Sequence, residues 1–280
     1  MARRPFTDEP MSRLAAWSSR CALFALAVAM LSVVIVRSGL LDIMPSLATF
    51  VAALVFAALA VLLAFASFIP IWRQGLTGLG HSILGMILGL LLLAYPGYLG
   101  YRAIKLPAIA DITTDAANPP RFEMLARQRP RGTSDYPGAR VAALQRAGYP
   151  DIVPLQLNAP LKLTYDVTLA LVTKRKWYVV DARAPAANRR DGVIEATART
   201  PIMGFRDDVV IRFSPIGING ARVDMRSASR YAWHDFGANA SRIRSLFEDI
   251  DDGVSSAPEP RPEPEKPEKK APARRQPANR

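Results

Sequence analysis

The sequence predicts three N-terminal transmembrane α-helices, an α+β domain in which helices flank an antiparallel sheet, and a disordered C-terminal tail. The first observation is a lack of charge, because between Cys21 and Tyr101 the charged side chains are Arg37, Asp42 and Arg73. The second is the alternation of apolar and polar residues in several later segments, which is typical of strands with one buried face. The third is the Pro-rich, charged composition after Val254, which cannot offset the entropy cost of ordering.

These changes in composition divide the chain into a cytoplasmic N-terminus at 1–20, a three-helix membrane anchor at 21–101, the α+β domain at 102–253 and the disordered tail at 254–280. The net charge of +12 is spread over all four parts. A nucleic-acid-binding protein usually gathers its basic side chains on one face, so no nucleic-acid partner is expected. Cys21 is the one cysteine, which excludes an intramolecular disulfide and argues against Cys-based zinc sites.

Three apolar runs supply the predicted spans, at 21–36, 47–69 and 79–101. A span needs about 20 apolar residues, so the first run is short unless residues from Ala15 onward extend it. A signal peptide is the alternative for this run, but no small-x-small cleavage site follows it. We expect the third run to bend at Pro96.

Basic residues beside the runs predict the orientation. Four arginines precede the first run, namely Arg3, Arg4, Arg13 and Arg20. Because positive charge is retained on the cytoplasmic side, the N-terminus is expected in the cytoplasm, and three crossings of the inner membrane place residues 102–280 in the periplasm. Arg102 and Lys105 add positive charge to the outer side and count against this orientation.

The third run contains "GMILG", in which Gly85 and Gly89 are separated by three residues. Small residues at this spacing let helix backbones approach closely. The motif therefore predicts either packing within the three-helix bundle, which we favour, or a homo-oligomer formed through the same two glycines.

The elements of the soluble part follow in order. Pro-punctuated residues 106–122 predict an extended linker, and residues 138–147 a short helix. Helical spacing of Leu161, Tyr165 and later apolar residues predicts a helix at 160–175. Four strands are then expected, at 177–182, 192–199, 207–214 and 221–229.

The strands have one apolar and one ionic face. The ionic face is expected to carry Glu195, Thr197, Arg199, Asp208, Arg212, Arg222, Asp224 and Arg226. We expect water to reach this face and its charges to pair across strands, each pair contributing about 0.2–1 kcal/mol. The other face is expected to pack on a final amphipathic helix that starts with Asp235 as N-cap. The apolar stripe of that helix is Phe236, Ala240, Ile243, Phe247 and Ile250.

Four segments together resemble a bacterial family catalogued as domain of unknown function 1499: "DITTDAANPPRF", "YPDIVPL", "IEATARTPIMGFRDDVVIRF" and "VDMRSASRYAWHDFGANASRIRSLF". The resemblance covers about 106–250. It implies the architecture of N-terminal spans followed by this domain, and it implies no activity, cofactor or catalytic residue. "YAWHDF" is bulkier and more aromatic than this stretch usually is in the family.

Candidate sites are few. A Ser-His-Asp arrangement can be drawn from Ser227 or Ser229 with His234 and Asp235, but no nucleophile elbow is present and the adjacent His and Asp have the wrong geometry. No metal-ligand cluster is evident, and no cofactor or catalytic residue is predicted. The best polar group for holding an anion lies between the last strand and the final helix and comprises Arg226, Ser227, Ser229, Arg230 and Asn239.

The sequence therefore predicts an inner-membrane-anchored protein of the cell envelope that presents a non-enzymatic binding module. Its expected partners are the lipid bilayer and an envelope protein or an anionic lipid. A lipid- or anion-binding site near Arg226 and Arg230 is the alternative, and a hydrolase is the least favoured reading. The sequence names no specific ligand.

Overall fold

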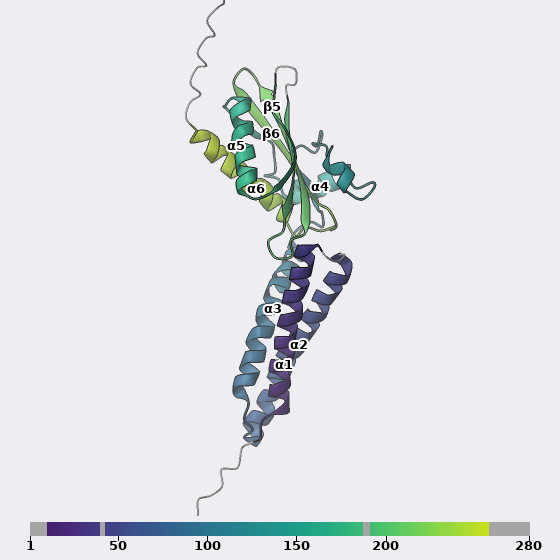
Figure 1. Cartoon of the computed structure of the whole chain (residues 1–280), viewed down its shortest axis with the longest axis vertical. Helices are drawn as coiled ribbons and strands as arrows, with labels where there is room; N and C mark the ends of the chain where they lie inside the picture. The colour runs from purple at the N-terminus through teal and green to yellow at the C-terminus, as the bar shows by residue number, and fades with distance from the viewer. Residues whose placement is uncertain (1–9, 40–42, 187–190, 258–280) are drawn as a thin grey trace, which may run out of the picture.

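The computed structural model describes residues 10–39, 43–186 and 191–257. A long helical bundle carries an α+β domain at one end (Figure 1). The predicted N-terminal arginines Arg3 and Arg4 lie outside the described residues, as does the predicted disordered tail from 258 onward. The last helix continues to Ser255, so the domain extends slightly beyond its predicted end.

The bundle consists of α1 (Arg13–Ser38), α2 (Ile43–Gln74) and α3 (Leu79–Lys105), each long and apolar enough to cross a membrane. The three predicted spans are therefore confirmed as helices, and each continues beyond its apolar run. α3 is helical through Pro96. α1 ends at Gly39, whose left-handed conformation lets its N–H donate to the carbonyls of Ile35 and Val36.

Small residues bring the three helices together. A Cβ on Gly85 would lie 2.0 Å from Ser18 Oγ, and a Cβ on Gly89 would lie 2.6 Å from Val61 Cγ2. Both glycines therefore face neighbouring helices of the same chain, as the preferred prediction had it. The alternative of a homo-oligomer through Gly85 and Gly89 stays a prediction.

The domain is built on one antiparallel sheet in the order β1-β6-β5-β4-β3, with β2 also paired to β6. Its strands are β1 (Asp111–Thr113), β2 (Leu155–Leu157), β3 (Tyr178–Arg183), β4 (Gly192–Arg199), β5 (Arg206–Ile216) and β6 (Gly220–Ser229). The four predicted strands are confirmed. The predicted linker is corrected, because β1 lies within it and pairs with β6.

α5 (Leu161–Lys174) and α6 (Ala238–Ser255) cover one face of the sheet, while α4 (Ala139–Gly148) lies to its side (Figure 1). The core beneath the two helices includes Phe213, which meets Tyr165 edge to face at 5.3 Å between ring centroids. The predicted stripe of α6 needs one change. Phe236 precedes the helix and Phe247 is only partly buried, whereas Leu246 is fully buried.

The middle of the other face of the sheet is covered and not open to water, which contradicts the sequence prediction: Glu195, Asp208 and Arg226 are buried. The segment between β1 and α4 folds across it and contains the short 3-10 helix η1 (Leu125–Gln128). Phe122 and Leu125 of this segment pack on Val210 and Ala228 of the sheet. The polar side chains of that face must therefore find partners within the protein.

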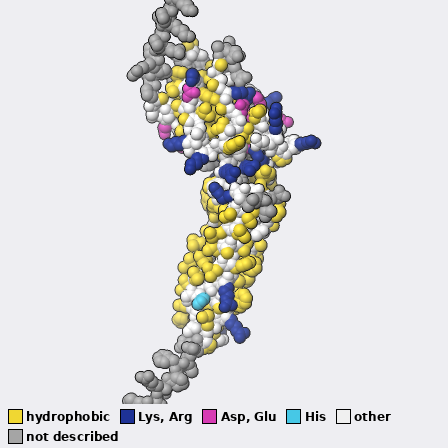
Figure 2. Space-filling model, in the orientation of Figure 1, with side chains coloured by type: hydrophobic (Ala, Val, Ile, Leu, Met, Phe, Trp, Pro, Cys, Tyr) yellow, Lys and Arg dark blue, Asp and Glu magenta, His cyan; other side chains and the backbone are white. Residues whose placement is uncertain are grey.

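Hydrogen bonds join the end of α1 to the loop between β4 and β5. Arg37 Nη1 donates to the carbonyl oxygens of Pro201 at 2.7 Å and Ile202 at 3.2 Å. In return, Arg199 Nη1 donates to the carbonyl oxygen of Arg37 at 3.2 Å. We call this junction the neck, and Lys and Arg side chains gather on it where the apolar bundle meets the domain (Figure 2).

Candidate functional site: the covered charged face

Glu195 lies in the middle of β4 and has no exposed surface. Its carboxylate accepts hydrogen bonds from the backbone N–H groups of Glu123 at 2.9 Å, Met124 at 3.2 Å and Leu125 at 2.8 Å. The first turn of η1 has such N–H groups without helical partners. Glu195 therefore caps the N-terminus of η1 from the sheet. These bonds hold the segment between β1 and α4, here called the covering segment, on the sheet.

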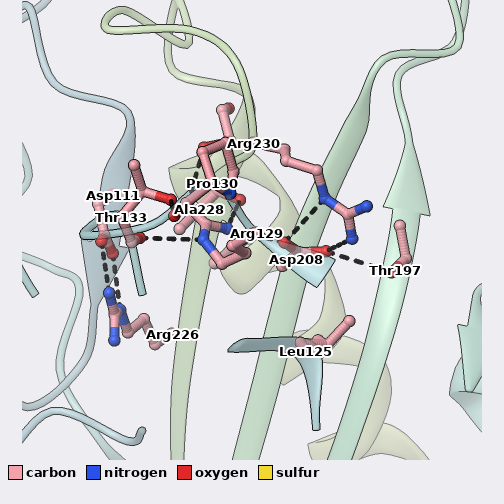
Figure 3. Close-up of polar contacts among 12 residues, drawn as sticks. Asp111, Leu125, Arg129, Pro130, Thr133, Thr197, Asp208, Arg226, Ala228 and Arg230 are labelled. Atoms are coloured by element: carbon pink, nitrogen blue, oxygen red, sulfur yellow. Dashed lines mark hydrogen bonds and ion pairs between the residues drawn. The ribbon is translucent and has the colours of Figure 1, made fainter. Parts of the chain in front are cut away.

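Asp208 on β5 is the centre of a second group (Figure 3). Its carboxylate accepts from Arg129 Nη1 at 2.8 Å, from Arg230 Nε at 3.1 Å and from Thr197 Oγ1 at 3.2 Å. Arg230 also donates through a second nitrogen, which gives the two-pronged geometry typical of strong arginine–carboxylate pairs. Arg129 comes from the covering segment, so this ion pair also ties that segment to the sheet.

Arg226 on β6 is 1 % exposed and forms the third group. Its guanidinium donates to both carboxylate oxygens of Asp111, at 2.9 and 2.7 Å (Figure 3). Its Cζ lies 4.5 Å from the ring centroid of Phe122 and 5.7 Å from that of Tyr136. Aromatic faces stabilise a desolvated guanidinium, so Arg226 is held by one carboxylate and two rings.

Burial also affects the ionisation of Tyr136. Desolvation, and after it the charge of Asp111, raises the pKa of its hydroxyl to about 12. The phenol therefore stays protonated and neutral beside the ion pair at every pH near neutrality.

A fourth group lies at the other end of the same face. Asp224 accepts from Arg212 at 2.9 Å and from Arg222 at 2.9 Å, and Arg222 also reaches Asp115 at 2.7 Å. Arg212 and Arg222 are partly exposed, whereas Asp224 is buried. The predicted pairing across strands is therefore confirmed here, while the predicted exposure is not.

The five residues proposed from sequence to hold an anion do not converge on one free site. Arg226 and Arg230 lie on the covered charged face, each with its own carboxylate. Ser227 points to the opposite face, where its Oγ donates to Asn239 Oδ1 at 2.7 Å. Asn239 in turn donates to Ser229 Oγ at 3.2 Å. An anion at Arg226 or Arg230 would have to displace a buried carboxylate.

The residues proposed for a Ser-His-Asp arrangement are used differently. Asp235 accepts from the backbone N–H groups of Gly237 at 2.8 Å and Asn239 at 2.7 Å, so it caps the start of α6 as predicted, from just before the helix. Burial raises its pKa. His234 Nδ1 accepts from the N–H of Phe236 at 3.0 Å. Neither side chain is bonded to the other or to a serine, so the catalytic arrangement is not formed.

Sequence reasoning missed four members of these groups, namely Asp111, Arg129, Glu195 as a cap, and Arg242. Arg242 pairs with Asp207 on the helix-covered face. Asp207 and Asp208 thus point to opposite faces, as adjacent strand residues should. Asp111 and Arg226 are 115 positions apart, so no local spacing links them. Asp208 and Arg226 were identified as charged strand residues. The alternation of apolar and polar residues could not show that another segment covers them.

A shallow hollow of about 330 Å³ lies between the loop after α4 and α6. It is lined by Asp151, Ile152, Val153, Leu155, Ile243, Arg244, Phe247, Glu248 and Asp251. Its lining combines apolar and charged side chains, and among the charged ones Arg244 is paired to Asp151. Glu248 and Asp251 make the lining acidic.

Within 10–39, 43–186 and 191–257, no three His, Cys, Asp or Glu side chains are grouped so that they could hold a metal ion. The profile of a family described as "Protein of unknown function (DUF1499)" matches residues 111–250. A search of curated proteins found no match. The matched segment begins at β1 and ends in α6, so it contains the whole sheet and all the ion pairs that close its charged face.

Proposed function

The chain belongs to the DUF1499 family of proteins of unknown function, and we propose that it is a cell-envelope protein whose three-helix anchor presents the family domain as a non-enzymatic binding module. One observation carries this proposal. The buried acids and bases of the charged face, Asp111, Glu195, Asp208, Asp224, Arg226 and Arg230, all have protein partners. General acid–base chemistry needs a titratable group within reach of a substrate, and these groups are covered.

The hollow beside α6 is the surface that suits binding best. Among its lining residues, Val153 has 57 % of its surface accessible, and Glu248 and Asp251 are acidic. Protein interfaces also combine apolar contact area with polar and charged surface. The partner that fits is a protein segment with apolar side chains flanked by Lys or Arg.

Site-specific photocrosslinking in intact cells tests this proposal. We expect a crosslinker at Val153 to give one protein adduct of defined mass, and the adduct to weaken strongly in an E248K/D251K variant. Tyr178 on the edge strand β3 is 70 % exposed and serves as the control position. Equal adducts at both positions, or an adduct at Val153 that the charge reversal leaves unchanged, would contradict the proposed interface.

The domain is proposed to face the periplasm. Arg13, Arg20 and Arg73 lie at the end of the bundle away from the domain, which favours a cytoplasmic position for that end. A reporter that is active only in the periplasm, fused after Val254, is expected to be active. A signal from a reporter that is active only in the cytoplasm, fused at the same position, would contradict this orientation.

The alternative of a lipid- or anion-binding site centred on Arg226 and Arg230 is less well supported by the geometry, because both guanidinium groups already have buried carboxylate partners. Purified full-length protein carrying R226K/R230K is expected to retain the same copurifying lipids as wild type. Selective loss of one lipid from a folded variant would restore this alternative.

A further inference from the structure

Three arginines without carboxylate partners meet at the neck. Arg199 ends β4 and Arg206 begins β5, and the two are directly opposite each other in the ladder. Arg37 lies beside them, because Arg199 Nη1 donates to its carbonyl oxygen at 3.2 Å. All three side chains are exposed, and none forms an ion pair with any described acidic residue.

Like charges directly opposite each other on a sheet destabilise it. The nearest acid on the same face is Asp208, the next residue but one after Arg206 along β5. Asp208 is already engaged by Arg129 and Arg230. Arg206 has no side-chain hydrogen bond to any residue that the structure describes. Arg37 and Arg199 donate to backbone carbonyls, but no described carboxylate offsets the positive charge of this group, and an external anion would do so.

The position of these three arginines along the axis of the helical bundle indicates where the anion would lie relative to a membrane. α1 and α3 run side by side, with Gly85 against Ser18 and Gly78 near Ala15. This register places the end of α1, with Arg37, level with the end of α3, where Arg102 and Lys105 lie. Tyr98 and Tyr101 lie on α3 just before this level. Tyrosines and basic residues at a helix end mark the boundary between hydrocarbon and headgroups.

Exposed aromatic residues of the domain lie at the same boundary. The N–H of Arg230 donates to the carbonyl oxygen of Arg206 at 3.2 Å, and the loop that follows exposes 50 % of Tyr231 and 79 % of Trp233. The same loop returns to α3, since a Cβ on Gly237 would lie 2.6 Å from Arg102 Nη2. Trp and Tyr side chains favour the interfacial layer of a bilayer.

We propose that Arg37, Arg199 and Arg206 bind the headgroup phosphate of an anionic phospholipid in the adjacent leaflet, with Tyr231 and Trp233 inserted among neighbouring headgroups. Guanidinium groups bind phosphate oxygens through paired N–H donors. The acyl chains of that lipid would lie against the apolar surface of the bundle directly beneath. This site goes beyond the proposed protein interface, which lies on a different surface, beside α6.

Native mass spectrometry of the full-length protein in detergent tests the proposal, with short-chain phosphatidylglycerol as the probe. Wild type is expected to bind phosphatidylglycerol in preference to phosphatidylcholine. The R199Q/R206Q variant should bind it at least about tenfold more weakly, since each charge-assisted hydrogen bond lost contributes about a factor of ten or more. R199K/R206K should retain much of the preference, because it keeps the positive charge.

The matched control is R127Q/R140Q, which removes two exposed arginines from η1 and α4. It should bind phosphatidylglycerol as wild type does. If R199Q/R206Q does not fold, the single R206Q variant replaces it, because the Arg206 side chain has no hydrogen bond or ion pair to lose among the described residues, and a weakening of several-fold is then expected.

Three results would overturn the site. They are unchanged lipid binding by the folded neck variant, an equal loss in the control variant, and equal binding of phosphatidylcholine by wild type. Competition by glycerol 3-phosphate at the concentration at which phosphatidylglycerol binds would show that the arginines hold a free phosphate, and the lipid assignment would fall. Because none of these measurements involves the hollow, they leave the proposed protein interface to its own test.

Discussion

The two faces of the sheet are covered in different ways. On one face, α5 and α6 bury apolar side chains such as Ile211 and Phe213. On the other face, the segment between β1 and α4 covers Glu195, Asp208 and Arg226, which are as inaccessible as the apolar core. An apolar contact tolerates exchange for a side chain of similar volume, whereas a buried charge requires its particular partner.

The comparison explains why the charged face is sensitive to single substitutions. Two of the ion pairs there join residues far apart in sequence, since Arg226 pairs with Asp111 of β1 and Asp208 pairs with Arg129 of the covering segment. The pair between Asp208 and Arg129 helps to fix where the covering segment lies. Loss of one partner leaves the other buried and unpaired, and that penalty exceeds the modest net contribution of the intact pair.

The largest effect is expected from R226A. Removing this guanidinium leaves Asp111 without its buried partner and empties the space between Phe122 and Tyr136. We expect the free energy of unfolding to fall by about 3–5 kcal/mol, measured by urea unfolding of the full-length protein in mild detergent. R222A, which removes a partly exposed guanidinium from the same face, should cost less. Equal small losses in both variants would mean that the face is open to water.

On the apolar face, L246A should lower the free energy of unfolding by about 2–5 kcal/mol, because it creates a cavity under α6. The adjacent F247A is the control and should cost clearly less, since Phe247 is partly exposed at the edge of the hollow. Urea unfolding of both full-length variants in mild detergent measures the two losses. A larger loss in F247A would mean that α6 is rotated relative to the sheet.

E195Q should cost about 1–3 kcal/mol, because the carboxylate accepts three backbone hydrogen bonds and the amide supplies a weaker acceptor and a buried donor without an acceptor. Hydrogen exchange should rise at the amides of Glu123, Met124 and Leu125 while the amides of β5 stay protected. Unchanged exchange at these three amides would contradict the capping role of Glu195.

An effect of alkaline pH on stability is also expected. Burial raises the pKa of Tyr136 and of Tyr149 to about 12 from the ordinary value of 10.0. Below pH 10 both hydroxyls are protonated in the folded and unfolded states, and between pH 10 and 12 ionisation favours the unfolded state. Stability should therefore fall as pH rises through this window. A Y136F/Y149F variant should lose less over the same range, and a steeper loss in that variant would contradict the assignment.

The sequence predicts the elements of this protein better than it predicts what covers them. The spans follow from uncharged runs, and β4 to β6 follow from alternation. Alternation separates the two faces of a strand, but it does not say whether water or another segment covers the polar face. Here the cover is a Pro-rich stretch with two apolar anchors, Phe122 and Leu125, and a stretch of that kind has no helical or strand period to detect.

The residues of the candidate anion site were predicted from sequence, but the segments that cover them and supply their partners were not. Arg226 and Arg230 were proposed from sequence as part of an anion site, because they lie at the end of a strand near the start of a helix. Their carboxylate partners come from β1 and β5, and a pairing with β1 could not be expected while that stretch was read as a linker. Arg199 and Arg206, which have no carboxylate partner among the described residues, are visible as a pair only once the register of β4 and β5 is known.

The central claim is that Arg226 and Arg230 are buried against carboxylate partners, whereas Arg199 and Arg206 at the neck are exposed and have no carboxylate partner among the described residues. Labelling of the full-length protein in detergent with phenylglyoxal, an arginine-specific reagent, tests it directly when the modified positions are mapped by mass spectrometry. We expect rapid modification of Arg199 and Arg206 and protection of Arg226 and Arg230 until urea unfolds the domain. Modification of Arg226 at the rate of Arg206 in the folded protein would contradict the account.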